Sequence, residues 1–153
     1  MPKCFVGSGN RMPITVAILG AGSLFGQGLI KALKISSLDV RLVGIDFFPH
    51  AVGLYWTHSA HLLPDILNPA VHEEDYVQRL IHILNQEKAD VLLVAVDFEI
   101  PRMAKHRSRM ENQTHCRVVV SSPDVADIGD DKWATHQFLK KYAFPCQRMD
   151  PEK

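Results

Sequence analysis

The stretch "VAILGAGSLFGQGLIKAL", residues 16–33, joins an apolar run to a glycine-rich turn and an amphipathic segment. The β-branched, apolar character of residues 14–19 predicts a strand that is buried on both faces. The apolar residues after the turn recur at the spacing of one helix face: Gly26, Leu29, Ile30 and Leu33. A strand, a tight turn and a helix therefore open the fold, and the turn is the first candidate functional site.

Strand and helix patterns alternate along the rest of the chain. Further strands are predicted in four apolar runs, at 41–46, near 60–64, at 90–96 and at 116–122. Helices are predicted around 77–84, 99–110, 123–129 and 131–142. Such alternation favours right-handed βαβ units. We expect an α/β fold, a three-layer Rossmann-like parallel sheet of order 3-2-1-4-5, with strands 14–19 and 90–96 adjacent at its centre.

Composition is typical of a globular protein of one domain. Hydrophobic residues make up 46% of the 153 residues, charged residues 22%, and the formal net charge is zero. This balance gives no sign of a nucleic-acid or membrane partner, and no apolar stretch approaches the roughly 20 residues of a membrane span. The three cysteines are odd in number and far apart, which favours a reducing cytoplasm. Residues 1–13 are expected to be a flexible lead.

The glycine turn has the chemistry of an anion site. Gly20 can take a positive φ, Gly22 lets a ligand approach the backbone, and Gly26 permits close helix packing. The helix N-terminus and the Ser23 hydroxyl offer hydrogen-bond donors. The G-x-G-x-x-x-G spacing is one residue longer than the dinucleotide fingerprint, although Asp46 lies where a ribose-binding acid belongs. The residues alone leave open an anion or substrate site, NAD(P) binding, or a purely structural turn.

Two acidic residues follow the strand predicted at 90–96. If this strand neighbours the first, Asp97 and Glu99 line a crevice together with the glycine turn. The alternative is that Asp97 caps a helix and Glu99 is a favourable first-turn acid. His58 and His61 have no third ligand in register, so we expect no metal site.

Residues 121–146, "SSPDVADIGDDKWATHQFLKKYAFPC", resemble the entry into an ATP-grasp fold. An Asp-Lys pair opens the helix there, and "FPC" follows it. Three upstream segments, 20–34, 43–55 and 96–107, are similar to the pre-ATP-grasp domain of proteins like the large subunit of carbamoyl-phosphate synthase. The resemblance covers about residues 14–146. It divides the chain into a pre-ATP-grasp domain at 14–130 and, at 131–153, the start of a linker helix.

The resemblance implies the substrate-side domain of a ligase. In that family ATP phosphorylates a small-molecule carboxylate, an amine, thiol or similar nucleophile displaces phosphate, and Mg²⁺ bridges the phosphates. The lysine of the Asp-Lys pair often reaches the nucleotide, which carries over to Lys132. The family's phosphate loop and metal ligands would lie beyond Lys153, in a missing ATP-grasp lobe. We therefore expect no catalytic residue, bound cofactor or independent activity in this chain, and a possible homo-oligomer.

The surroundings of Lys132 can also be predicted. Its ammonium should be exposed, on a helix started by Asp130 or Asp131. The resemblance indicates that Ala134, Phe138, Leu139 and Tyr142 pack this helix. An exposed aromatic patch of Trp133, Tyr142 and Phe144 would mark the surface on which the second lobe docks. Three hypotheses follow: a ligase domain, an NAD(P)-binding oxidoreductase domain, or a stand-alone binding module.

Overall fold

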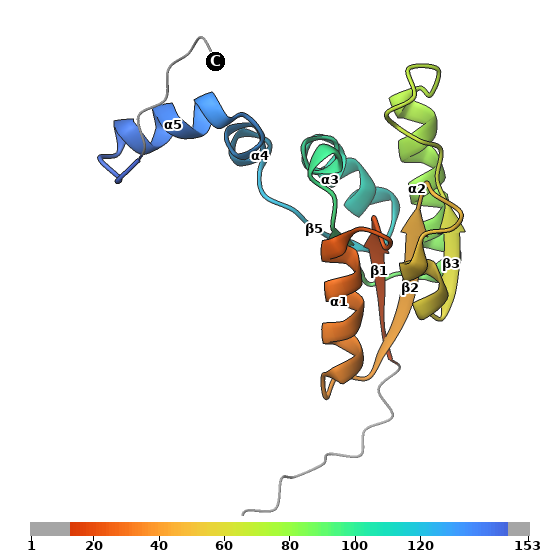
Figure 1. Ribbon diagram of the computed structural model, residues 1–153. Coiled ribbons are helices and arrows are strands. Elements are labelled where there is room, and N and C mark those ends of the chain that lie inside the picture. The colour runs from red at the N-terminus through yellow and green to blue at the C-terminus, as the bar shows by residue number, and fades with distance from the viewer. Residues whose placement is uncertain (1–12, 147–153) are drawn as a thin grey trace, which may run out of the picture.

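The computed structural model describes residues 13–146, which form a five-stranded parallel sheet and the helices around it (Figure 1). The strand order is β3-β2-β1-β4-β5. The strands are β1 (Ile14–Leu19), β2 (Val40–Asp46), β3 (Ser59–Leu62), β4 (Val91–Val94) and β5 (Arg117–Val119). Central β1 pairs with β2 and β4, and Leu19 lies opposite Val94. The predicted sheet order and the adjacency of the first and fourth strands are confirmed.

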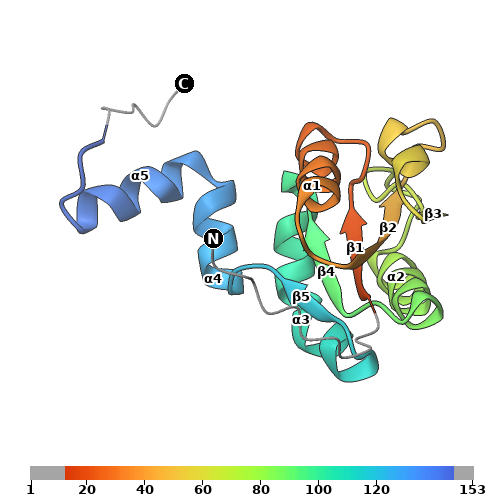
Figure 2. The same ribbon diagram turned by 90° about the horizontal axis from the view of Figure 1, so that it is seen from below.

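Helices cover the sheet on both faces, as Figure 2 shows. The helices are α1 (Leu24–Ile35), α2 (Glu73–Glu87), α3 (Ile100–Gln113), α4 (Pro123–Asp130) and α5 (Lys132–Lys141), with 3₁₀ turns η1 (Val52–Trp56) and η2 (Asp97–Glu99). On one face α1 and η1 pack through a smaller apolar core, and on the other α2 and α3 pack through a larger one. This three-layer arrangement explains why residues 15–19 of β1 are all buried and why residues 16–19 are all apolar.

Two strands are shorter than the sequence predicts. The apolar run 90–96 pairs only up to Val94, because the chain then enters η2. The edge strand β5 pairs from Arg117 to Val119, opposite Val91 to Leu93 of β4. The helix predicted at 99–110 begins at Ile100 and continues to Gln113, where the Thr114 hydroxyl donates to the Met110 carbonyl at 2.8 Å.

The C-terminal helices extend away from the sheet (Figures 1 and 2). Helix α4 packs against α3, and α5 packs against α4. The Asp131 carboxylate caps α5 by accepting hydrogen bonds from the backbone of Trp133 and Ala134, so the predicted helix start is confirmed.

The packing of α5 differs from the sequence expectation. Phe138 and Tyr142 are 39% and 55% exposed, so the prediction that they pack this helix is wrong, whereas the exposure of Tyr142 agrees with the predicted aromatic patch. The side chain that α5 buries is His136, which stacks on Trp133. The physical reason is the position of α5, which packs against α4 and contributes no residue to either apolar core. The predicted lead and the last residues of the linker, 1–12 and 147–153, lie outside the described residues.

Candidate functional site

The glycine turn lies between β1 and α1 at the carboxyl edge of the sheet. Gly20 has the positive φ that was expected, at 74°. A Cβ on Gly26 would lie 2.2 Å from the Gly20 carbonyl oxygen, so α1 can approach the turn only because this residue lacks a side chain. The predicted structural functions of Gly20 and Gly26 are confirmed.

The remaining polar groups of the turn are engaged by the protein itself. The Gly22 N–H donates to Asp46 Oδ2 at 2.8 Å, and the Phe48 N–H donates to Asp46 Oδ1 at 3.0 Å. Asp46 is consequently buried, with 6% of its surface exposed. A Cβ on Gly22 would lie 2.5 Å from the Ala51 Cβ, because the segment leading into η1 folds over the turn. At Gly22 the close neighbour is therefore this segment of the chain.

Ser23 links the glycine turn to the end of β4 through hydrogen bonds. Its hydroxyl accepts the Gly26 N–H at 2.9 Å, which caps α1, and donates to the Ala95 carbonyl at 3.0 Å. Ala95 follows β4, so one side chain links the ends of β1 and β4. These ends meet at the point between β1 and β4 where the order of successive strands reverses, the usual place for a ligand crevice in such folds.

Asp97 and Glu99 lie on opposite sides of the 3₁₀ turn η2. The alternative that Asp97 caps a helix is wrong, because η2 intervenes and the N-cap position of α3 is Glu99, whose side chain makes no capping bond. Asp97 is exposed and borders several cavities, among them the two described below. Glu99 points inward and is only 4% exposed. The two predicted acids therefore occupy very different environments.

Burial makes the carboxyl group of Glu99 an unusually weak acid. Its Oε1 accepts a hydrogen bond from the Tyr76 hydroxyl at 2.6 Å, and within residues 13–146 its buried Oε2 has no partner. Burial raises the pKa of Glu99 to about 7, and the negative charge of Asp46 adds to this. The Tyr76 hydrogen bond and the positive charge of Arg102 act in the opposite direction. Glu99 can thus hold or release a proton near neutral pH.

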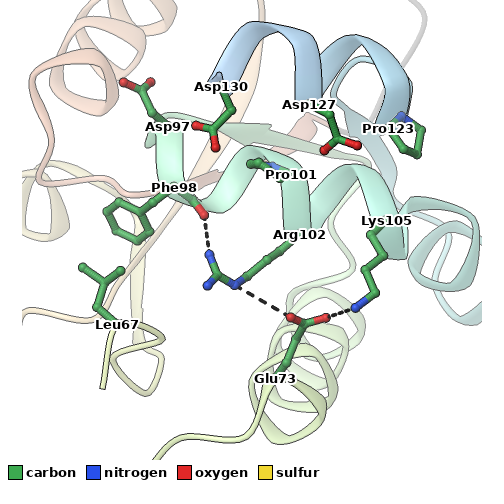
Figure 3. Close-up of a pocket in the computed structure, with 10 residues that line it drawn as sticks. All are labelled: Leu67, Glu73, Asp97, Phe98, Pro101, Arg102, Lys105, Pro123, Asp127 and Asp130. Atoms are coloured by element: carbon green, nitrogen blue, oxygen red, sulfur yellow. Dashed lines mark hydrogen bonds and ion pairs between the residues drawn. The ribbon is translucent and has the colours of Figure 1, made fainter. Parts of the chain in front are cut away.

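A cavity of about 850 Å³ lies between the start of α2, η2 with α3, and α4 (Figure 3). Arg102 donates to the Phe98 carbonyl at 2.5 Å, and its Nε lies 3.8 Å from a Glu73 oxygen. Lys105 contacts the other Glu73 oxygen at 2.7 Å. Acidic side chains of α4, Asp127 and Asp130, line the opposite wall. The cavity thus presents both positive and negative groups to a ligand.

Sequence reasoning missed Glu73, Arg102 and Lys105 as cavity residues. Arg102 and Lys105 are spaced i, i+3 on α3, and this spacing directly after Asp97 was a usable signal. Their acidic partner comes from α2, and only the fold brings the two helices together. The hydrogen bond with Lys105, and to a smaller extent the one with His106, lowers the pKa of Glu73. Glu73 therefore stays ionised at neutral pH.

A second, mostly apolar cavity of about 600 Å³ lies on the other side of Asp97. It is lined by residues of α1, of the end of β4 and of the following turn: Leu24, Phe25, Gly28, Leu29, Ala32, Val94, Ala95, Asp97 and Ile100. The sequence predicted a crevice lined by Asp97 and Glu99 together with the glycine turn, but of these residues only Asp97 lines this hollow. Gly20, Gly22 and Asp46 hold the turn beside it.

The remaining candidates lie elsewhere. Lys132 is exposed on the first turn of α5, as predicted, and it does not line either cavity.

The two histidines weighed as metal ligands have protein partners. His58 accepts the Leu42 N–H through Nδ1, and His61 pairs with Glu87. In residues 13–146 no three His, Cys, Asp or Glu side chains are grouped to hold a metal ion. None of the helices described could cross a membrane.

Comparison with known proteins identifies the fold. No family model and no curated protein matches the chain. Among solved structures, the biotin carboxylase subunit of pyruvate carboxylase matches with a TM-score of 0.60 and 16% identity, over 92% of this chain and 30% of that one. N5-carboxyaminoimidazole synthetase from Staphylococcus aureus, solved with ADP, matches with a TM-score of 0.57 and 15% identity, over 88% and 31%.

A complete multifunctional pyruvate carboxylase from Rhizobium etli matches with a TM-score of 0.61 and 13% identity, over 88% of this chain and 13% of that one. The chain thus spans 30% of the first of these solved chains. The matched regions are the N-terminal parts of these ATP-grasp enzymes. The described chain therefore has the fold of a pre-ATP-grasp domain, as the sequence resemblance predicted.

Proposed function

We propose that this chain is the N-terminal, substrate-side domain of an ATP-dependent ligase of the ATP-grasp type. The single observation that carries the proposal is the projecting helix α5, which Asp131 caps and which starts with the exposed Lys132. It follows directly on a sheet with the fold of the N-terminal regions of ATP-grasp enzymes. The parent enzyme would activate a small carboxylate with ATP, for attack by an amine, thiol or similar nucleophile.

The cavities beside η2 are the proposed substrate side. Asp97 borders both cavities, and the proton-holding Glu99 lies just beneath it. The glycine turn, with Gly20, Gly22, Ser23 and Gly26, and the acid Asp46 would act as the scaffold that fixes one wall. Arg102 and Lys105 supply the positive charge that a carboxylate substrate needs. The substrate would bind in the cavity that Arg102 and Lys105 line, beside η2.

ATP and Mg²⁺ need groups that the described residues do not provide. Lys132 is one candidate phosphate ligand, because an exposed ammonium on a helix start is a compact point charge. Residues 13–146 hold no cluster of three metal-ligating side chains. They do not by themselves make up a Mg-ATP site, so an ATP-grasp lobe would complete it. The exposed aromatic side chains of Trp133, Tyr142 and Phe144 are the proposed docking surface for that lobe.

A homo-oligomer of the parent enzyme is also proposed. The support is indirect: one similar structure, from Hydrogenobacter thermophilus, is described as a biotin carboxylase domain dimer, with a TM-score of 0.60 and 13% identity. Sedimentation of the chain at micromolar concentration would test whether this domain alone carries the contact.

The coding sequence after Lys153 provides a direct test of the proposed function. A reading frame that continues into a glycine-rich hairpin and an acidic metal site supports the ligase, whereas a stop codon favours a stand-alone binding module. Where the frame continues, the longer protein should hydrolyse ATP with magnesium, and Lys132→Ala should raise its KM for ATP. Lys141→Ala, a lysine at the other end of α5, serves as the matched control. An unchanged KM in Lys132→Ala would contradict the assignment.

A further inference from the structure

Glu99 is a buried carboxyl group with incomplete hydrogen bonding. Its side chain is 4% exposed, it accepts one hydrogen bond, from Tyr76, and among residues 13–146 its Oε2 meets no donor or acceptor. Almost all buried polar atoms in proteins have partners, so such an orphan needs an explanation. The protonated carboxyl tolerates this environment far better than the carboxylate, because burial penalises the charged form.

The groups around Glu99 come from three elements. Tyr76 of α2 donates to it, and Asp46 at the end of β2 adds negative charge nearby. Arg102 lies one turn further along α3, but its guanidinium donates to the Phe98 carbonyl and faces Glu73. An ionised Glu99 would therefore have one neutral donor, Tyr76, and would be repelled by the negative charge of Asp46. An ionised Glu99 would gain by moving toward Arg102.

The backbone that carries Glu99 is suited to such a movement. Glu99 ends η2, a turn of three residues held by the Glu99 N–H to the Val96 carbonyl at 3.2 Å and by the Ile100 N–H to the Asp97 carbonyl. Its neighbours Asp97 and Phe98 already line the 850 Å³ cavity that contains Arg102 (Figure 3). A short turn with two backbone bonds can open locally while the sheet stays folded.

We propose that ionisation of Glu99 opens η2 and moves the Glu99 carboxylate into the cavity beside Arg102. The closed form holds a protonated Glu99 under the turn, and the open form exposes a carboxylate to solvent and to the guanidinium. The cavity would then change its charge and shape with pH. This device is separate from the proposed ligase function, because it requires only the groups described above.

The expected pH profile follows from proton linkage. Burial raises the pKa of Glu99 from 4.5 to about 7 in the closed form, whereas an exposed carboxyl keeps its ordinary value. The equilibrium constant for opening should therefore rise about tenfold per pH unit between these two values and then level off. The total rise is roughly 300-fold, the ratio that corresponds to a shift of about 2.5 units.

Amide hydrogen exchange tests the proposal on the intact chain. Exchange of the Glu99 and Ile100 amides, corrected for the intrinsic pH dependence, should follow this profile, while the amides of β1 should not. Glu99→Gln should abolish the pH dependence. Asp97→Asn is the matched control, because this neighbouring acid is exposed and its loss should leave the profile unchanged. An identical profile in Glu99→Gln and in the wild type would overturn the proposal.

Two further measurements separate a switch from a merely structural carboxyl. Tyr76→Phe and Arg102→Gln each remove a group that favours the carboxylate, so both should move the upper end of the profile to higher pH. Carbon-13 titration of the Glu99 carboxyl in the wild type gives its pKa without any substitution. A pKa near 4.5, or a flat exchange profile in the wild type, would refute the inference even if a variant failed to fold.

Discussion

Gly26 and Gly28 lie in the same helix and should respond in opposite ways to alanine. A Cβ on Gly26 would lie 2.2 Å from the Gly20 carbonyl oxygen and 2.9 Å from the Ala21 Cα. A Cβ on Gly28 would meet no atom within 4 Å. Both substitutions gain the same helix propensity. The difference between their free energies of unfolding therefore reports the contact between α1 and the glycine turn.

The magnitude of this difference can be estimated from the contacts. Replacing glycine by alanine within a helix stabilises a protein by about 1 kcal/mol. Overpacking costs about 1–3 kcal/mol, and the upper end applies at Gly26 because the opposing atoms are backbone, which cannot rotate away. We expect Gly28→Ala to be more stable than the wild type by about 1 kcal/mol and Gly26→Ala to be less stable by about 2 kcal/mol.

Urea unfolding, followed by tryptophan fluorescence, measures both values. A gap of about 3 kcal/mol corresponds to a difference in Tm of roughly 6–12 °C for a chain of this size. Circular dichroism of the two variants controls for a change in helix content. Equal stability of Gly26→Ala and Gly28→Ala would refute the argument that the turn and α1 are held at van der Waals contact.

Four further outcomes are expected. Asp46→Asn should destabilise the chain by about 1–3 kcal/mol in urea unfolding, because its amide can accept from only one of the two backbone N–H groups now bound. NADH fluorescence titration should show no saturation at micromolar concentration, since the Asp46 carboxylate and the Gly22 N–H already bind each other, and saturation would revive the oxidoreductase hypothesis. Lys132→Ala should change stability by less than about 0.5 kcal/mol, as expected for an exposed side chain, and a larger loss measured as Tm would contradict this environment. Because the pKa of Glu99 is raised from 4.5 to about 7, stability should fall as pH rises through that window, by at most about 3 kcal/mol, and Glu99→Gln should flatten the curve.

The sheet was predictable because burial on both faces leaves an unambiguous pattern. Residues 16–19 and 91–94 are apolar without interruption, and such runs are typical of central strands. The limits of β5 were less predictable, since its apolar sequence continues to Val120, one residue beyond the last pair with β4. The exposure of Phe138 was also missed, because the spacing of apolar residues shows a helix face but not what lies opposite it.

The candidate site was only partly predictable for a similar reason. An acid after the second strand can bind a ribose or a backbone N–H, and the sequence around Asp46 is the same in both cases. The structure distinguishes them through the segment before η1, which folds over the turn and brings Ala51 to Gly22. The pair of Tyr76 and Glu99 joins two helices, so no local pattern indicates it.

The hydrogen bond from Ser23 to the Ala95 carbonyl has a consequence for how a ligand would arrive. It holds the β1–α1 turn against the end of β4, so this side of the cavity is already ordered before a ligand binds. The facing wall, η2, is held by two backbone bonds. A ligand would thus meet one preorganised side and one adaptable side. Its association rate would be limited by rearrangement of η2, while the fixed side would set the orientation in which encounters succeed.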